Sequence, residues 1–363
     1  MPVRYSKKLD ALRHYEGGMD IDRARRMYEA SDVIKLASNE SPWGPHPAVL
    51  EAIGAAAAGS NRYPDQYASL LRRRLADRYE VEPGTIAVAN GSCEILLAAA
   101  LALCEPGAEI LYAWPSFSMY PQLAPLSGAR EIRVPLNGAY EHDLEAMATE
   151  VTAATQLVLV CNPNNPTGTA LPVAAIAAFL DRVPDHVTVI LDEAYVEMPV
   201  LDDPDATVDL LPEHPNLVLL RTFSKVYGLA GLRCGYALGS AGFRAAVDAV
   251  RQPFDVNALA QAAGAEALLH ADDMIARVER TIAERIGVED ELHDLGLRTA
   301  ASQTNFSWID LGDRDEATIV EELGRRGVIV RAGTPLGGPG HIRVTYGTEA
   351  ENRRFLDALA ELL

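Results

Sequence analysis

The feature that most constrains the fold is a series of short apolar segments between residues 85 and 239, several of them separated by helical patterns. These segments read as strands at 85–90, 109–113, 156–160, 187–192, 216–220 and 233–239. Residues 92–107, by contrast, have a helical pattern with Ser92 near its start and Gly107 past its end. Near-continuous apolar strands alternating with helices are typical of a parallel sheet covered on both faces. The sequence therefore predicts an α/β fold with a mostly parallel sheet.

The pattern changes after about residue 250. A long helical stretch at 257–296 leads into strand patterns at 304–311, 327–333 and 340–347, and an amphipathic helix at 349–363 ends the chain. A chain of 363 residues is too long for one compact core and suggests two domains at most. We predict a large domain at 41–250, and a smaller α+β domain formed by 251–363 together with an N-terminal arm at 1–40.

Charge and cysteine content exclude several classes of function. The formal net charge is −19, which disfavours nucleic acid and anionic membrane surfaces as partners. No apolar run reaches the ~18–20 residues of a membrane helix, and the N-terminus shows no secretory signal. The four cysteines are scattered without a C-x-x-C pair, which argues against a metal cluster and fits a reducing cytoplasm.

One lysine, Lys225, stands in the otherwise apolar and glycine-rich stretch "TFSKVYGLAGLRCGYAL", 222–238. An unpaired buried charge is expensive, so we expect this lysine to be paired, neutral or covalently occupied. As a lone residue it could equally be an ordinary lysine at a helix start.

Ligands of open α/β sheets bind beyond the carboxyl ends of the strands, so the residues that follow the predicted strands are the candidates for a site. The strand ends supply a helix N-terminus, a flat aromatic, an amide, a carboxylate, a phenol and an amine, at Ser92-Cys93, Phe117, Asn165, Asp192, Tyr195 and Lys225. These groups suit a phosphate, a flat ring, a ring oxygen, a ring nitrogen and an aldehyde. That combination predicts pyridoxal phosphate.

Other readings of the same residues are weaker. The strand end "VTVILDEA", 187–194, is similar to the acidic strand end of a P-loop ATPase, but the chain has no G-x-x-x-x-G-K-[ST]. No G-x-G-x-x-G for a dinucleotide occurs either. Taken singly, Phe117 could be plain core, Tyr63 a turn aromatic and Arg331 a solvated strand end.

Eight motifs in order resemble the fold-type I, class I and II aminotransferases, most closely their histidinol-phosphate branch. They are "KLASNESPWGP", "NRYPD", "NGSCE", "CNPNNPTG", "LDEAY", "TFSKVYGLAGLRCGY", "TNF" and "RVTYGT". The resemblance runs from Tyr15 to the final helix and implies an aspartate-aminotransferase-like fold.

The resemblance also implies a role for each matching residue. Lys225 would form the internal aldimine with pyridoxal phosphate and move the proton of the substrate, with Asp192 holding the pyridine nitrogen protonated. Asn165 and Tyr195 would bind the ring oxygen, and Phe117 would stack on the ring. The phosphate would be held by Thr222, Ser224, Arg233 and the Ser92-Cys93 amides, although relatives usually carry an acidic residue in place of Cys93. Substrate would be bound by Tyr15, Asn39, Arg331 and Arg343, the last on the carboxylate.

Tyr63 would reach the cofactor phosphate of a neighbouring subunit, so the resemblance implies a homodimer with shared sites. It implies transfer of an amino group from L-histidinol phosphate to 2-oxoglutarate in a ping-pong reaction. An aromatic amino-acid aminotransferase is the alternative. A threonine-phosphate decarboxylase or a cofactor-binding regulator without turnover would share the same cofactor residues. Because the 332–342 loop varies in length among relatives, it leaves the substrate side-chain pocket open.

Overall fold

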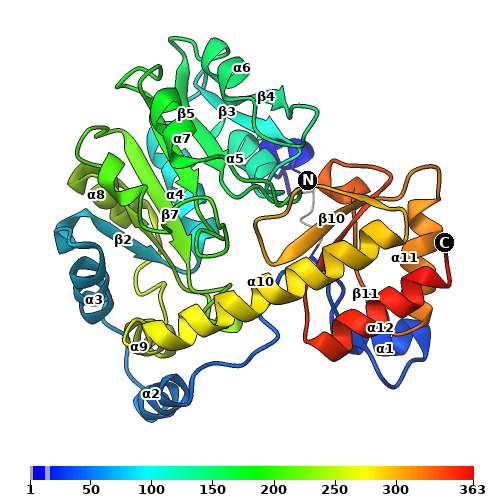
Figure 1. Cartoon of the computed structure of the whole chain (residues 1–363). Coiled ribbons are helices and arrows are strands. Elements are labelled where there is room, and N and C mark those ends of the chain that lie inside the picture. The colour runs from blue at the N-terminus through cyan, green and yellow to red at the C-terminus, as the bar shows by residue number, and fades with distance from the viewer. Residues whose placement is uncertain (1–2, 13–16) are drawn as a thin grey trace.

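The computed structural model describes residues 3–12 and 17–363, and Figure 1 shows two parts joined by a long helix. The larger part is built on a seven-stranded sheet of order β2-β8-β7-β6-β5-β3-β4, in which β8 alone runs antiparallel to its neighbours β2 and β7. Its strands are β2 (Ile86–Ala89), β3 (Glu109–Trp114), β4 (Arg130–Pro135), β5 (Thr155–Cys161), β6 (Thr188–Asp192), β7 (Leu217–Thr222) and β8 (Gly235–Leu238). The mostly parallel sheet expected from the sequence is confirmed.

Helices cover both faces of this sheet, which is why its central strands are apolar almost throughout. In β5, Val158 and Val160 pack into the core on one face, while Leu157 and Leu159 pack into the core on the other. The first face is covered by α3 (Ser69–Tyr79), α6 (Leu144–Thr149), α7 (Val173–Leu180) and α9 (Ala258–Ala267). The second face is covered by α4 (Ser92–Leu103), α5 (Tyr120–Ser127) and α8 (Ala241–Val250).

The smaller part is a four-stranded antiparallel sheet of order β12-β13-β10-β9 with helices packed against it. Its elements are β9 (Arg298–Thr299), β10 (Phe306–Asp310), β12 (Arg331–Ala332), β13 (His341–Thr345), α11 (Glu316–Arg325) and α12 (Glu349–Ala360). The predicted strand at 327–333 divides into β12 and a short β11 (Val328–Ile329), which belongs to a different sheet.

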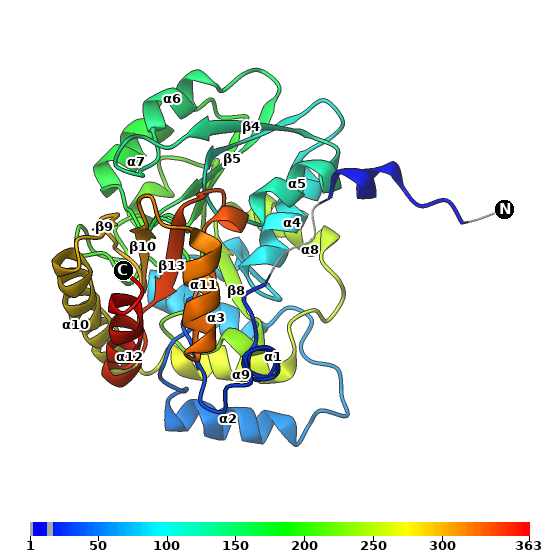
Figure 2. The same ribbon diagram turned by 90° about the vertical axis from the view of Figure 1, so that its right-hand side faces the viewer.

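The N-terminal segment contributes to both parts. β1 (Ile34–Lys35) pairs in parallel with β11, and α1 (Ile21–Tyr28) lies against α11 of the smaller part. The 3-10 turn Lys7–Ala11 instead lies against α5, and Figure 2 shows the chain before it leading away from the body of the protein. The helix α2 (Pro47–Ala57) packs on α9.

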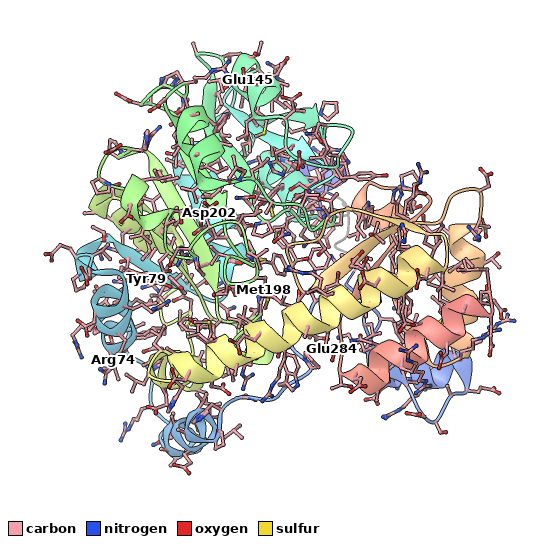
Figure 3. All side chains as sticks on the ribbon, viewed as in Figure 1. Arg74, Tyr79, Glu145, Met198, Asp202 and Glu284 are labelled. Carbon is pink, nitrogen blue, oxygen red and sulfur yellow. The ribbon has the colours of Figure 1, made fainter. Side chains whose placement is uncertain are left out.

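The predicted helical stretch at 257–296 forms two helices, α9 and α10 (Ala271–Asp294). Figure 1 shows α10 crossing from one part to the other. Val288 near its end belongs to the core of the smaller part, and Glu284 accepts a hydrogen bond from Asn352 of α12, 2.6 Å away. On the other side Arg285 donates to the carbonyl of Met198, 3.3 Å away, and Figure 3 labels Glu284 and Met198.

Core packing bears on where the domains divide. Ala260 and Ala263 of α9 lie in the core of the larger part, beyond the boundary predicted at residue 250. The division into 41–250 against 1–40 and 251–363 remains a prediction. We propose that its second boundary lies later, along α10. Within the part of the chain that the structure describes, no helix is both long enough and apolar enough to span a membrane.

Candidate active site

A cavity of about 360 Å³ opens where the carboxyl ends of β5, β6 and β7 face the antiparallel sheet. Of the predicted site residues that the structure describes, all but Tyr63 line it: they are Asn39, Ser92, Cys93, Phe117, Asn165, Asp192, Tyr195, Thr222, Ser224, Lys225, Arg233, Arg331 and Arg343. Tyr15 lies outside the described residues. Residues that follow different strands, far apart in the sequence, thus lie around one cavity.

Lys225 follows β7, is half-buried and lines the cavity. Its Nζ donates to the carbonyl oxygen of Asn39 at 3.2 Å and lies 5.4 Å from the centre of the Tyr195 ring. Burial, followed by the positive charge of Arg343, lowers the pKa of Lys225 from 10.5 to about 8. The side chain is therefore an amine that becomes neutral and nucleophilic close to physiological pH.

Asn39 links the N-terminal arm to both sheets. Its backbone adopts a left-handed conformation with φ of 53°, and its Nδ2 donates to the Tyr195 hydroxyl at 2.8 Å. Its backbone N–H donates to Thr345 Oγ1 at 2.8 Å, which ties it to β13. Burial raises the pKa of the Tyr195 phenol, so this hydroxyl stays protonated and can donate into the cavity.

Asp192 ends β6 and is 2% exposed. Its Oδ2 accepts a hydrogen bond from the Tyr120 hydroxyl at 2.9 Å, whereas Oδ1 is buried and has no hydrogen-bond partner among the described residues. Burial raises the pKa of Asp192 to about 6, the Tyr120 hydrogen bond opposing that rise. The sequence analysis missed Tyr120. Its only signal was its position three residues after Phe117, because its hydroxyl meets Asp192 only in the folded chain.

An anion site lies at the N-terminus of α4. Gly91 precedes the helix with φ of 86°, and a Cβ there would stand 2.5 Å from Nη2 of Arg233. The Arg233 Nη1 lies 3.4 Å from Ser224 Oγ, which in turn lies 3.0 Å from Thr222 Oγ1. Backbone amides at a helix start, two hydroxyls and a guanidinium together suit a phosphate group.

The second cationic group of the cavity comes from the antiparallel sheet. Arg331 of β12 and Arg343 of β13 are directly opposite each other in the strand register, and both line the cavity. Arg343 donates to Asn165 Oδ1 at 2.6 Å and to the Ala37 carbonyl at 3.0 Å, and Arg331 donates to the Gly17 carbonyl at 2.9 Å. With its oxygen turned to Arg343, the Asn165 amide keeps Nδ2 as a donor for another acceptor.

Tyr63 lies away from this cavity. Its ring is 81% exposed and stacks on Phe254 with 4.7 Å between ring centres. The described chain thus gives Tyr63 no contact with its own site.

These residues fit pyridoxal phosphate on three observations. The buried Oδ1 of Asp192 has no hydrogen-bond partner among the residues that the structure describes, so it can accept one from a protonated ring nitrogen. Gly91 leaves space beside the Arg233 guanidinium that a Cβ at position 91 would fill. Lys225, which lines the same cavity, offers an amine of lowered pKa.

Comparison with known proteins agrees with this fit. Residues 31–359 match the family model for aminotransferase class I and II. The chain is 42% identical to a histidinol-phosphate aminotransferase of Geobacillus thermodenitrificans, over 99% of this chain and 98% of that protein. It is 44% identical to an aromatic amino acid aminotransferase of Streptomyces coelicolor, over 90% of each chain.

Among solved structures, the histidinol-phosphate aminotransferase of Sinorhizobium meliloti in complex with pyridoxal 5'-phosphate superposes with a TM-score of 0.90. It is 29% identical, over 100% of this chain and 98% of that one. The resemblance and the aspartate-aminotransferase-like fold expected from the sequence are confirmed. The chain therefore belongs to the class I and II aminotransferases, with pyridoxal phosphate as its cofactor.

Proposed function

We propose that this aminotransferase transfers the amino group of L-histidinol phosphate to 2-oxoglutarate, the transamination step of histidine biosynthesis. The observation that carries the proposal is the pair of arginines, Arg331 and Arg343, which are opposite each other in the strand register and both line the cavity. Histidinol phosphate has no α-carboxylate, so its phosphate has to supply the anchoring charge, whereas 2-oxoglutarate brings carboxylates. Guanidinium forks bind both kinds of anion.

The global charge makes this local pair significant. A chain with a net charge of −19 repels anions in general, so an anionic substrate requires a positive site of its own. The phosphate cradle around Arg233 is assigned to the cofactor. We assign Arg331 and Arg343, which also line the cavity, to the substrate anion.

The protein residues divide the remaining chemistry between them. Pyridoxal phosphate, when bound, carries the amino group and stabilises negative charge at the substrate Cα. Lys225 would hold the cofactor aldehyde and, once displaced by the substrate amine, would take the proton from the substrate Cα and deliver it to the aldehyde carbon of the cofactor. Asp192 would keep the ring nitrogen protonated, while Asn165 and Tyr195 would donate to the ring oxygen. Phe117 would cover one face of the ring and keep water from it.

An aromatic amino-acid aminotransferase is the alternative, and it is favoured by relatives of that description at 44% and 46% identity. A flat aromatic side chain and an imidazole ring are both planar, so they need a pocket of similar shape. The two readings differ in the anion, a carboxylate for the amino acid and a phosphate for histidinol phosphate.

The test is the ratio of kcat/KM for histidinol phosphate to kcat/KM for phenylalanine. We expect histidinol phosphate to be preferred and Arg331→Gln to lower its kcat/KM roughly 10–150-fold, since a charge-assisted hydrogen bond is lost, with little effect on phenylalanine. Arg298→Gln, on β9 of the same sheet with its guanidinium on Asp310, is the control. Equal losses on both substrates would assign Arg331 to structure. A preference for phenylalanine that Arg331→Gln leaves unchanged would favour the aromatic reading.

We further propose that the enzyme is a homodimer with shared active sites, in the cytoplasm. Tyr63 is an exposed aromatic residue, and Tyr67 and Leu70, close to it in the sequence, are exposed as well. Exposed hydrophobic side chains of this kind support the proposal that a second copy of the chain covers this surface. The four cysteines are all free thiols, which supports a reducing compartment.

A further inference from the structure

Tyr120 is a fully buried phenol that contacts a proposed cofactor ligand and is not among the residues that line the cavity. It is the first residue of α5, is 0% exposed, and its hydroxyl lies 2.9 Å from Asp192 Oδ2. Its ring meets that of Phe117 edge to face, with 5.7 Å between centres and 86° between planes. The Tyr120 side chain therefore contacts both Phe117, the proposed ring-stacking residue, and the Asp192 carboxylate.

The two oxygens of Asp192 have different surroundings. Oδ2 receives the Tyr120 hydroxyl, while Oδ1 is buried with no hydrogen-bond partner in residues 3–12 and 17–363. A donor on one oxygen fixes the rotation of the carboxylate and favours its ionised form over the neutral acid. Burial acts in the opposite sense on Asp192. The Tyr120 hydrogen bond is the largest of the effects that oppose this rise in the pKa of Asp192, ahead of the backbone N–H of Ala194.

We infer that Tyr120 is a positioning residue, which keeps the Asp192 carboxylate ionised and turned so that Oδ1 meets the protonated ring nitrogen of the cofactor. The inference rests on the role proposed for Asp192. It predicts that Tyr120 acts on the ring nitrogen and on no other part of the cofactor.

A second buried tyrosine provides a matched control. Tyr112 on β3 is also 0% exposed and packs edge to face against Tyr120 at 5.7 Å, but its hydroxyl donates to Glu131 at 2.6 Å. Tyr112→Phe therefore removes the same atom from the same core without touching Asp192.

The experiment measures the dissociation constants of the cofactor-free protein for pyridoxal phosphate and for its 1-deaza analogue, which has C–H in place of the ring nitrogen. Both ligands carry the same aldehyde and phosphate, so the ratio of the two constants reports the ring nitrogen alone. Partial unfolding of a variant weakens both ligands equally and cancels in the ratio. We expect Tyr120→Phe to reduce the preference for pyridoxal phosphate about 10-fold, and Tyr112→Phe to leave it unchanged.

Asp192→Asn separates this inference from the role on which it rests. If Asp192→Asn abolishes the preference but Tyr120→Phe changes it less than about twofold, Tyr120 is structural and the inference is overturned, whereas the role of Asp192 stands. If Asp192→Asn also leaves the preference intact, the proposed role of Asp192 fails. Equal loss of preference in Tyr120→Phe and Tyr112→Phe would attribute the effect to core packing and overturn the inference as well.

Discussion

At the scale of single residues, Lys225 shows a conflict between stability and chemistry. Its side chain is half-buried, its amine faces the positive charge of Arg343, and that amine makes one described hydrogen bond, to a carbonyl. The unfolded chain keeps its proton up to about pH 10.5, whereas the folded chain releases it near pH 8. A buried amine that serves catalysis therefore destabilises the cofactor-free fold at neutral pH.

We predict that Lys225→Met abolishes transamination and stabilises the cofactor-free protein. Below pH 8 a pKa lowered from 10.5 to about 8 corresponds to roughly 3 kcal/mol. Because the unfolded state binds the extra proton between the two pKa values, wild-type stability rises with pH there and the advantage of the variant shrinks. Urea unfolding of both cofactor-free proteins at a series of pH values measures this, with the exposed Lys8→Met as control. A variant less stable than wild type throughout would contradict the prediction.

The sequence could predict some site residues because the strand-end rule is local. Lys225, Asp192 and Asn165 each follow a recognisable strand, and the structure does bring them to one cavity. Arg331 and Asn39 obey no such rule. They come from opposite ends of the chain and reach the cavity through β12 and the arm, so only the family resemblance indicated them. The Tyr120 contact, made across two elements, had no local pattern at all.

At the scale of elements, the start of α4 depends on a backbone conformation that side chains rarely adopt. Gly91 has φ of 86°, and its missing Cβ leaves room for the Arg233 guanidinium. A turn of this kind holds backbone amides and guanidinium around one anion.

We predict that Gly91→Ala weakens binding of pyridoxal phosphate by the cofactor-free protein at least about 10-fold, because strain and displacement of Arg233 both act on the cradle. Gly107→Ala is a matched control, since Gly107 also has a positive φ, of 101°, but a Cβ there would meet nothing within 4 Å. Absorbance titration gives both constants. Similar losses in the two variants would attribute the effect to backbone strain alone and remove the steric argument.

Element prediction failed where burial was lowest. The edge strand β4 was missed because four of its six residues are exposed, which gives it no apolar run to recognise. The strands β3, β5, β6 and β7 were found because both of their faces are buried. The break between α9 and α10 at 268–270 was missed because the helical pattern of the sequence continues through it.

At the scale of the whole molecule, the cavity needs both sheets and, by our proposal, a second subunit. Lys225 and Asp192 come from the seven-stranded sheet, whereas Arg343 comes from the four-stranded one. Within the described chain, Tyr63 contacts none of these three side chains and stacks on Phe254 at the surface.

We predict that Lys225→Ala and Tyr63→Ala, each inactive alone, regain activity when their subunits are exchanged. Random exchange makes half the dimers mixed, each with one intact site, so about a quarter of the wild-type activity is expected. Steady-state assays after verified exchange measure the recovery, and each variant exchanged with itself is the control. No recovery would show that Tyr63 acts within its own chain or not at all.

The long helix α10 also limits where insertions and deletions can be tolerated as the sequence evolves. Its 24 residues span about 36 Å and join the two parts. A single inserted residue would rotate everything beyond it by about 100° and carry Arg343 away from Lys225. Insertions and deletions are therefore expected to be excluded from α10 among functional descendants, and to accumulate in connections such as 333–340, between β12 and β13, where a change of length leaves the two sheets in place.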